Sequence, residues 1–156
     1  MKKVLIVIQD MASGGGQKSL LSFLKCMENS KMINLYQIDL IIAKPEGIFY
    51  SQIPASVHLL PTPKELLWLG TPLGNKMLIE NFCIKGCIGK FKWIVENKIF
   101  QLNKELNEEQ KLWHLWKNII PQSENYYDIA ISYMNGFPNY YVMDKVYAKK
   151  KVLWIH

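Results

Sequence analysis

The chain of 156 residues falls within the size range of one domain, and its 49% hydrophobic and 21% charged residues exclude a mainly disordered protein. Nineteen basic against thirteen acidic residues give a formal net charge of +6, and every basic residue is lysine. Arginine reads bases and phosphates through paired hydrogen bonds, so its absence argues against nucleic acid as a partner. The codon bias of an AT-rich genome accounts for the missing arginine equally well.

Cysteine and histidine are too scattered to indicate a disulfide framework or a metal site. The three cysteines, Cys26, Cys83 and Cys87, include no C-x-x-C pair, and the three histidines show no ligand spacing. The apolar run at residues 4–8 is too short for a signal peptide, and no run approaches the roughly 18 apolar residues of a membrane span. We therefore expect a cytoplasmic protein that binds no metal.

The N-terminal part of the chain predicts a strand, a glycine loop, a helix and two further strands. Residues 3–8 are expected to be the first strand, because the unbroken apolar run at 4–8 is typical of a strand buried on both faces of a parallel sheet. A glycine loop at residues 14–16 follows, and leucines at helical spacing then predict a helix that ends near residue 30. Residues 36–43 and 57–60 are expected to be the second and third strands.

The middle of the chain, residues 64–120, predicts helices and no strand. Residues 91–106 carry apolar side chains at helical spacing. Asn107 is expected to cap a further helix, because two glutamates follow it in what would be the first turn. Pro121 is expected to end this helical region.

The last part of the chain returns to alternating elements, with a strand at residues 128–133, a short helix at 139–147 and a strand at 151–155. Strands that alternate with helices predict an α/β fold, a doubly wound and mostly parallel sheet. We expect the strand order 3-2-1-4-5, with a helical insertion between strands 3 and 4. His156 directly follows the last strand, where a sheet of this kind normally continues, so the chain is expected to be truncated.

Three loops are expected to meet at one edge of this sheet. In open parallel sheets, ligands bind outside the carboxyl ends of the strands, where the strand order reverses. In the expected order, the reversal falls between strands 1 and 4, and the loops after strands 1, 4 and 5 become neighbours. These loops contain Gly14, Gly15 and Gly16, then Asn135 and Gly136, and finally His156. The sequence therefore predicts a ligand-binding crevice lined by these residues.

Each of these features also has a purely structural interpretation. Consecutive glycines let the backbone approach a ligand and leave the first N–H groups of a helix open to it, yet they also form tight turns. The glycine loop does not match the dinucleotide fingerprint, because Ser19 stands where the third glycine belongs, and it lacks the P-loop spacing. Asn135 and Gly136 fit an ordinary turn with a positive φ, and His156 fits a polar residue at the rim of the sheet.

Four segments resemble a known family. They read VLIVIQDMASGGGQKSLLSFL at the start, KPEGIFYSQIP after the second strand, and YDIAISYMNGFPNYYV and KKKVLWIH at the end. Together they resemble the N-terminal half of a bacterial family 4 glycosyltransferase of the GT-B type, an enzyme with two Rossmann-like domains. The resemblance covers roughly residues 1–60 and 126–156, whereas residues 64–121 match only as a variable helical region.

The resemblance implies a retaining hexosyltransferase that moves a sugar from a nucleotide sugar to a glycan or lipid-linked acceptor in cell-surface polysaccharide synthesis. No metal or other cofactor is implied. Residues 1–156 would be the N-terminal, acceptor-binding domain. The C-terminal domain, absent here, would bind the donor through an E-x7-E pair, and no two acidic residues of this chain have that spacing.

The resemblance also assigns roles to the loop residues. His156 would contact the transferred sugar, and six residues would face the donor and the acceptor: Gly14, Gly15, Gly16, Gln17, Asn135 and Gly136. Since catalysis requires the reacting groups to be held together, half of an active site is expected to be inactive alone. The rival function is a non-catalytic nucleotide- or phosphate-binding Rossmann module.

Lysines and aromatic residues are interspersed through residues 64–120, and this pattern allows two interpretations. They fit an amphipathic surface on an anionic membrane, as in a peripheral enzyme on the inner face of the cell membrane. They also fit an apolar core with a solvated lysine face, which we favour.

Overall fold

A computed structural model describes residues 1–69 and 120–154, together with residues 106–107, 109–110, 113–114 and 117–118. The chain forms two compact units. The first joins Met1–Thr62 to Gln122–His156, and the second is Pro63–Pro121. The second unit is thus an insertion in the first, in the stretch where the sequence predicts a helical insertion.

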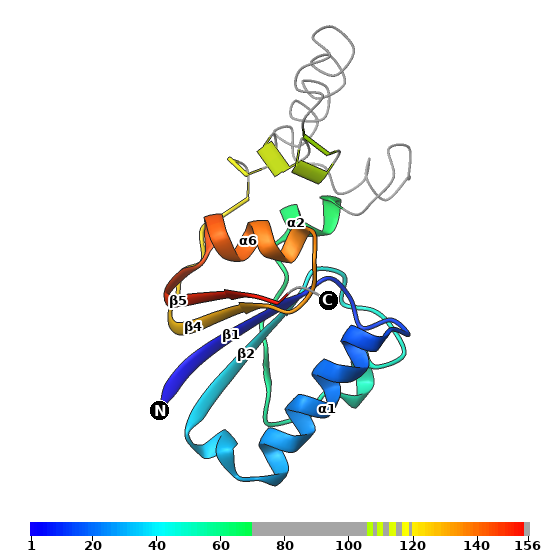
Figure 1. The fold of residues 1–156 in the computed structure, drawn as a ribbon, viewed down its shortest axis with the longest axis vertical. Coiled ribbons are helices and arrows are strands. Elements are labelled where there is room, and N and C mark those ends of the chain that lie inside the picture. The colour runs from blue at the N-terminus through cyan, green and yellow to red at the C-terminus, as the bar shows by residue number, and fades with distance from the viewer. Residues whose placement is uncertain (70–105, 108, 111–112, 115–116, 119, 155–156) are drawn as a thin grey trace, which may run out of the picture. The chain divides into compact units, whose positions relative to one another are not determined.

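In the described residues, the first unit contains a sheet of five strands, all parallel (Figure 1). The strands are β1 (Lys2–Ile8), β2 (Tyr36–Ile42), β3 (His58–Leu59), β4 (Tyr126–Ser132) and β5 (Tyr147–Leu153), in the order β3-β2-β1-β4-β5. The predicted α/β fold with a Rossmann-like parallel sheet is confirmed, and so is the order 3-2-1-4-5. β1 lies at the centre, and its residues from Val4 to Ile8 are all buried, as an unbroken apolar run predicts.

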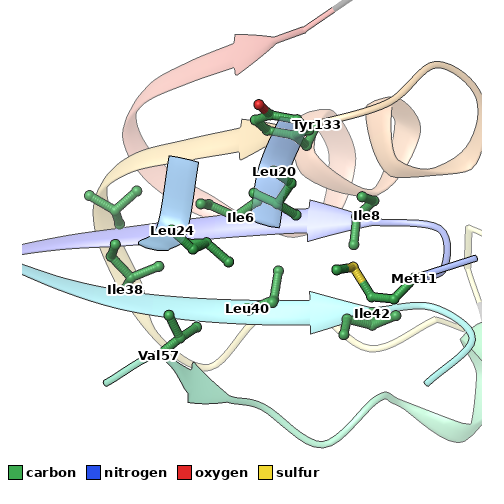
Figure 2. Packing of buried hydrophobic residues seen from close by; sticks show 11 residues of the cluster. Ile6, Ile8, Met11, Leu20, Leu24, Ile38, Leu40, Ile42, Val57 and Tyr133 are labelled. Carbon is green, nitrogen blue, oxygen red and sulfur yellow. The ribbon is translucent and has the colours of Figure 1, made fainter. Parts of the chain in front are cut away.

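Two helices cover opposite faces of this sheet, α1 (Gly15–Asn29) and α6 (Phe137–Lys145) (Figure 1). The main core lies on the α1 side (Figure 2). There Leu20 and Leu24 of α1 pack with Ile6 of β1 and Leu40 of β2, because alternate residues of a strand share one face. Two short 3₁₀ helices, η1 (Met32–Asn34) and η2 (Tyr50–Gln52), lie before β2 and β3 respectively.

The last helix and the last strand begin earlier in the structure than the sequence predicts. α6 begins at Phe137 rather than 139, because Pro138 has a φ that suits the first turn of a helix. β5 begins at Tyr147, which the sequence assigned to the helix, and ends at Leu153. The strand contains exposed lysines and has one neighbour, β4, so it lacks the apolar pattern of a buried strand. The other predicted strands shift by one or two residues at their ends.

The described part of the second unit contains α2 (Lys64–Leu69) and a helical segment that follows Asn107. Asn107 is confirmed as a cap. Its Oδ1 accepts the Gln110 N–H at 2.8 Å, and its own N–H donates to Gln110 Oε1 at 2.9 Å, the reciprocal pair of a capping box. Leu66, Trp113 and Ile120 are buried in this unit. The predicted helix at 91–106 lies almost wholly outside the described residues.

Candidate functional site

The loops after β1 and β2 are joined at the carboxyl edge of the sheet. Lys44 N–H donates to the Gln9 carbonyl at 2.7 Å, and Met11 exchanges two hydrogen bonds of 3.0 Å with the backbone of Glu46 and Phe49. Gly47 lies at this junction with a φ of +122°, and a Cβ on it would collide with the backbone of Met11. The loop after β2 therefore holds the loop after β1 in place, and only glycine fits at position 47.

The predicted glycine loop leads directly into α1. Gly14 is the N-cap, with extended backbone, and Gly15 and Gly16 form the first positions of the helix. No side chain caps α1, and its first turn contains no acidic residue. A Cβ placed on Gly15 would meet nothing within 4 Å, so open space borders the start of this helix. The positive end of the helix dipole lies at this first turn, which favours hydroxyl oxygens and anions as ligands.

Gln17 and Asp10 brace the glycine loop from inside. Gln17 is 7% exposed, and its Nε2 donates to Asp10 Oδ1 at 2.9 Å. The same carboxylate oxygen accepts the Ala12 N–H at 3.0 Å. A Cβ on Gly14 would collide with Gln17 Oε1, so this packing uses the missing side chain of Gly14. Gln17 is thus packed into the loop's own structure, and the ligand contact expected of it stays a prediction.

The loops after β4 and β5 reach the same edge. Tyr133 follows β4 and donates its N–H to the Val7 carbonyl at 2.9 Å, and Trp154 follows β5 and donates its N–H to the Ser132 carbonyl at 2.8 Å. The two aromatic rings stack, with centroids 5.3 Å apart and planes inclined by 20°. Tyr133 also connects to α1, because its hydroxyl lies 3.1 Å from Ser19 Oγ. The strand order thus places the loops after β1, β4 and β5 together, as predicted.

Gly136 has the positive φ, +89°, that the turn interpretation requires, and it forms the N-cap of α6. Its carbonyl accepts the Asn139 N–H at 3.0 Å, and Asn139 Oδ1 accepts the Ser132 hydroxyl. These bonds fix the loop after β4. A ligand role for Asn135 and Gly136 stays a prediction, and His156 lies outside the described residues.

A second polar cluster joins β2, β3 and β4 around a buried aspartate, with His58 at its exposed rim, and no sequence motif predicted it. Asp39 in β2 is 2% exposed, and its carboxylate accepts the Tyr127 hydroxyl at 3.0 Å and Gln37 Nε2 at 3.2 Å. His58 Nδ1 lies 3.2 Å from the same carboxylate. Burial, together with the hydrogen bond and the charge of Asp39, raises the pKa of Tyr127 to about 12, although a hydrogen bond with Asn125 acts in the opposite direction. The one sequence signal for this cluster was an aspartate within the apolar run YQIDLII.

Several residues of the edge were also not predicted, namely Asp10, Ser19, Tyr133 and Trp154. The sequence placed Trp154 inside the strand expected at residues 151–155, and the structure places it directly after β5. Within the described residues, no group of three or more histidine, cysteine, aspartate or glutamate side chains is placed to hold a metal ion. The helices described here also include none with the length and apolar character needed to cross a bilayer.

Together, the sheet and its loops define an α/β protein with a Rossmann-like parallel sheet and a loop cluster at the reversal of strand order. Comparisons of the chain with protein-family models, curated proteins and solved structures found no match.

Proposed function

We propose that this chain is the N-terminal, acceptor-binding half of a retaining GT-B glycosyltransferase. One observation carries the proposal: the first turn of α1 borders open space at Gly15, next to loops that follow β4 and β5. Ligands of open parallel sheets bind at this reversal of strand order. The resemblance of the loop sequences to the family supports a sugar rather than another ligand.

The groups at this edge suit a polyhydroxylated ligand. The N–H groups of the first turn of α1 can donate to sugar hydroxyl oxygens, and the Asp10 carboxylate can accept from sugar hydroxyls. The loops are held by backbone hydrogen bonds from Met11, Tyr133 and Trp154, so these groups are positioned before a ligand arrives. Such preorganisation lowers the cost of ordering the site on binding.

In this proposal the donor is a nucleotide sugar and the acceptor is a glycan or a lipid-linked glycan. The donor is held by a C-terminal Rossmann-like domain with the E-x7-E pair, and the enzyme transfers a hexose without a metal at the cytoplasmic face of the membrane. The 156 residues alone transfer no sugar, because the reacting groups of donor and acceptor are not held together. For residues 64–120 we favour an apolar core over attachment to anionic lipid, and the buried side chain of Trp113 supports a core at that position.

Substitution of Gly15 in the full-length enzyme tests the proposal. The open space beside Gly15 lets Gly15→Leu fold, while the leucine occupies the volume that the ligand needs. We expect transfer from the nucleotide sugar to fall by about 100-fold or more, since small displacements of a substrate have effects of that size. Ser22→Leu, at an exposed position of α1, is the matched control and should keep full activity. Equal activity of the Gly15→Leu and wild-type enzymes would disprove the assignment.

One observation favours the rival function, a non-catalytic nucleotide- or phosphate-binding module. The uncapped N-terminus of α1 is suited to a phosphate as well as to a hydroxyl. Calorimetric titration with inorganic phosphate, together with the transfer assay on the full-length protein, distinguishes the two functions, because the rival binds phosphate without transferring sugar. A coding sequence that continues past residue 156 into a second Rossmann pattern with the E-x7-E pair would support the transferase.

A further inference from the structure

A large aromatic side chain is held in a fixed position at the carboxyl edge of the sheet. Trp154 is 47% exposed, although its ring stacks on Tyr133 and its backbone N–H donates to the Ser132 carbonyl. Tyr133 is 4% exposed, and its hydroxyl is anchored to Ser19 of α1. Figure 2 shows Tyr133 at the end of β4, beside Leu20 of α1. The indole of Trp154 is therefore a supported flat surface rather than a loose side chain.

This aromatic pair adjoins the open space at the start of α1. Ser19 follows Gly15 by four residues, which places the two positions on one face of the helix, about 6 Å apart along its axis. Since Ser19 contacts Tyr133, Gly15 is on the side of α1 that faces the loops after β4 and β5. The open space at Gly15 thus lies one helical turn from the contact between Ser19 and the aromatic pair.

The aromatic and hydrogen-bonding groups around this space favour a neutral sugar over a phosphorylated ligand. The face of an aromatic ring carries negative charge in its π system and attracts the C–H face of a pyranose, while the hydroxyl groups at the rim of the sugar need hydrogen-bonding partners. The Ser19 hydroxyl, the Asp10 carboxylate and the N–H groups of α1 provide such partners at the same edge. The carboxylate repels a phosphate, so a neutral sugar fits better than a phosphorylated one.

We propose that Trp154 is the platform on which a pyranose ring of the acceptor saccharide stacks, with Tyr133 holding the indole in place. This inference rests on the proposed function and names the acceptor subsite within it. The exposed aromatic residues Tyr126 and Tyr147 lack these surroundings, because they pair with each other at the amino ends of β4 and β5. They therefore serve as controls.

NMR titration of the full chain tests the platform. Five tryptophans give five indole N–H signals, and the signal that disappears in Trp154→Phe identifies Trp154. One arm of the titration uses methyl hexopyranosides with maltose and cellobiose, and the other uses uridine and uridine diphosphate. We expect at least one saccharide to shift the Trp154 signal, and neither uridine ligand to shift it.

Variants of Trp154 and Tyr126 then test whether stacking on the indole causes the saccharide binding. Trp154→Ala should weaken saccharide binding by about tenfold, as expected for loss of one stacked ring, whereas Trp154→Phe should retain most of the affinity. Tyr126→Ala, which removes an exposed aromatic ring at the opposite end of β4, should bind as the wild type does. Dispersed amide spectra confirm that each variant is folded.

Three results would overturn the inference: a shift by uridine ligands instead of saccharides, no shift by any saccharide, or equal affinities of Trp154→Ala and wild type. The proposed function fails separately, through the transfer assay on Gly15→Leu. A full-length enzyme that transfers sugar and loses activity in Gly15→Leu, yet keeps its saccharide affinity in Trp154→Ala, would retain the function and exclude the platform.

Discussion

The loops after β1 and β2 both contain glycine at the same edge of the sheet, but the two glycines serve different purposes. Gly47 lies where the Met11 backbone passes too close for any side chain, and its φ is +122°. Gly15 lies at the start of α1, where a Cβ would have no atom within 4 Å of it. The first glycine is required for packing within the protein, whereas the second leaves room for something outside it. A glycine in a loop thus indicates a ligand site only where its missing side chain leaves open space.

Gly47→Ala should produce the largest effect on stability. Alanine is strained at this φ, and its Cβ collides with the backbone of Met11, so the two loops must separate. We expect the free energy of unfolding to fall by about 3 kcal/mol, measured by urea denaturation followed by circular dichroism. Ile48→Ala is the matched control, because Ile48 is next in the chain and 64% exposed, and it should change stability by less than about 0.5 kcal/mol. Similar stability of Gly47→Ala and the wild type would contradict the close packing of the loops.

The buried cluster around Asp39 provides a reference away from both loops. Tyr127→Phe removes the 3.0 Å hydrogen bond to Asp39 while keeping the buried ring, and Gln37 Nε2 still donates to the carboxylate. We expect a loss of about 1–2 kcal/mol in the free energy of unfolding at pH 8, and no change in ligand binding at the loops. A loss of ligand affinity in this variant would mean that the cluster and the loops are coupled.

The same variant should change how stability depends on pH. The pKa of Tyr127 rises from 10.0 to about 12 on folding, so the folded state favours the neutral phenol. Its contribution is fully present below pH 10 and is lost as the pH rises through about 12. Tyr141, whose pKa burial also raises to about 12, adds a parallel loss. Urea denaturation at pH 8 and pH 11 should therefore show a smaller decrease for Tyr127→Phe than for the wild type.

Much of the fold could be predicted because its signals are local. The apolar run of β1, the leucines of α1 and the alternation of strands with helices together indicated the parallel sheet, and its order was taken as the usual one for such sheets. The start of β5 could not be predicted in this way, because a strand with exposed lysines has no apolar pattern. Its assignment depends on pairing with β4, which is a tertiary contact.

The candidate site was predicted only in outline, for a related reason. The glycine run was visible in the sequence, and so was the turn at Gly136. The steric role of Gly47 depends on a backbone 36 residues earlier in the chain, at Met11. The stacking of Trp154 on Tyr133 depends on the adjacency of β4 and β5. Interactions between distant segments leave no periodic pattern in the sequence, so they become visible only in the folded structure.

Gly14→Ala should have an intermediate effect, because Gly14 combines features of both loops. Its backbone is extended and suits any residue, but a Cβ displaces the buried amide of Gln17 and its hydrogen bond to Asp10. We expect a loss of about 1 kcal/mol in urea denaturation, the size of one hydrogen bond. If the collision is the cause, Gly14→Ala should cost much less in a Gln17→Ala background, and full additivity of the two substitutions would contradict it.

Gly15→Ala should have the smallest effect and the opposite sign. Nothing within 4 Å opposes the new methyl group, and alanine restricts the unfolded chain and favours helix more than glycine does. We expect the free energy of unfolding to rise by about 0.5 kcal/mol. If the space beside Gly15 serves a ligand, the same variant should bind saccharide more weakly while being more stable, and Gly15→Leu more weakly still. A residue whose substitution stabilises the fold and impairs binding is retained for its ligand, and unchanged binding in both variants would leave Gly15 as a simple turn residue.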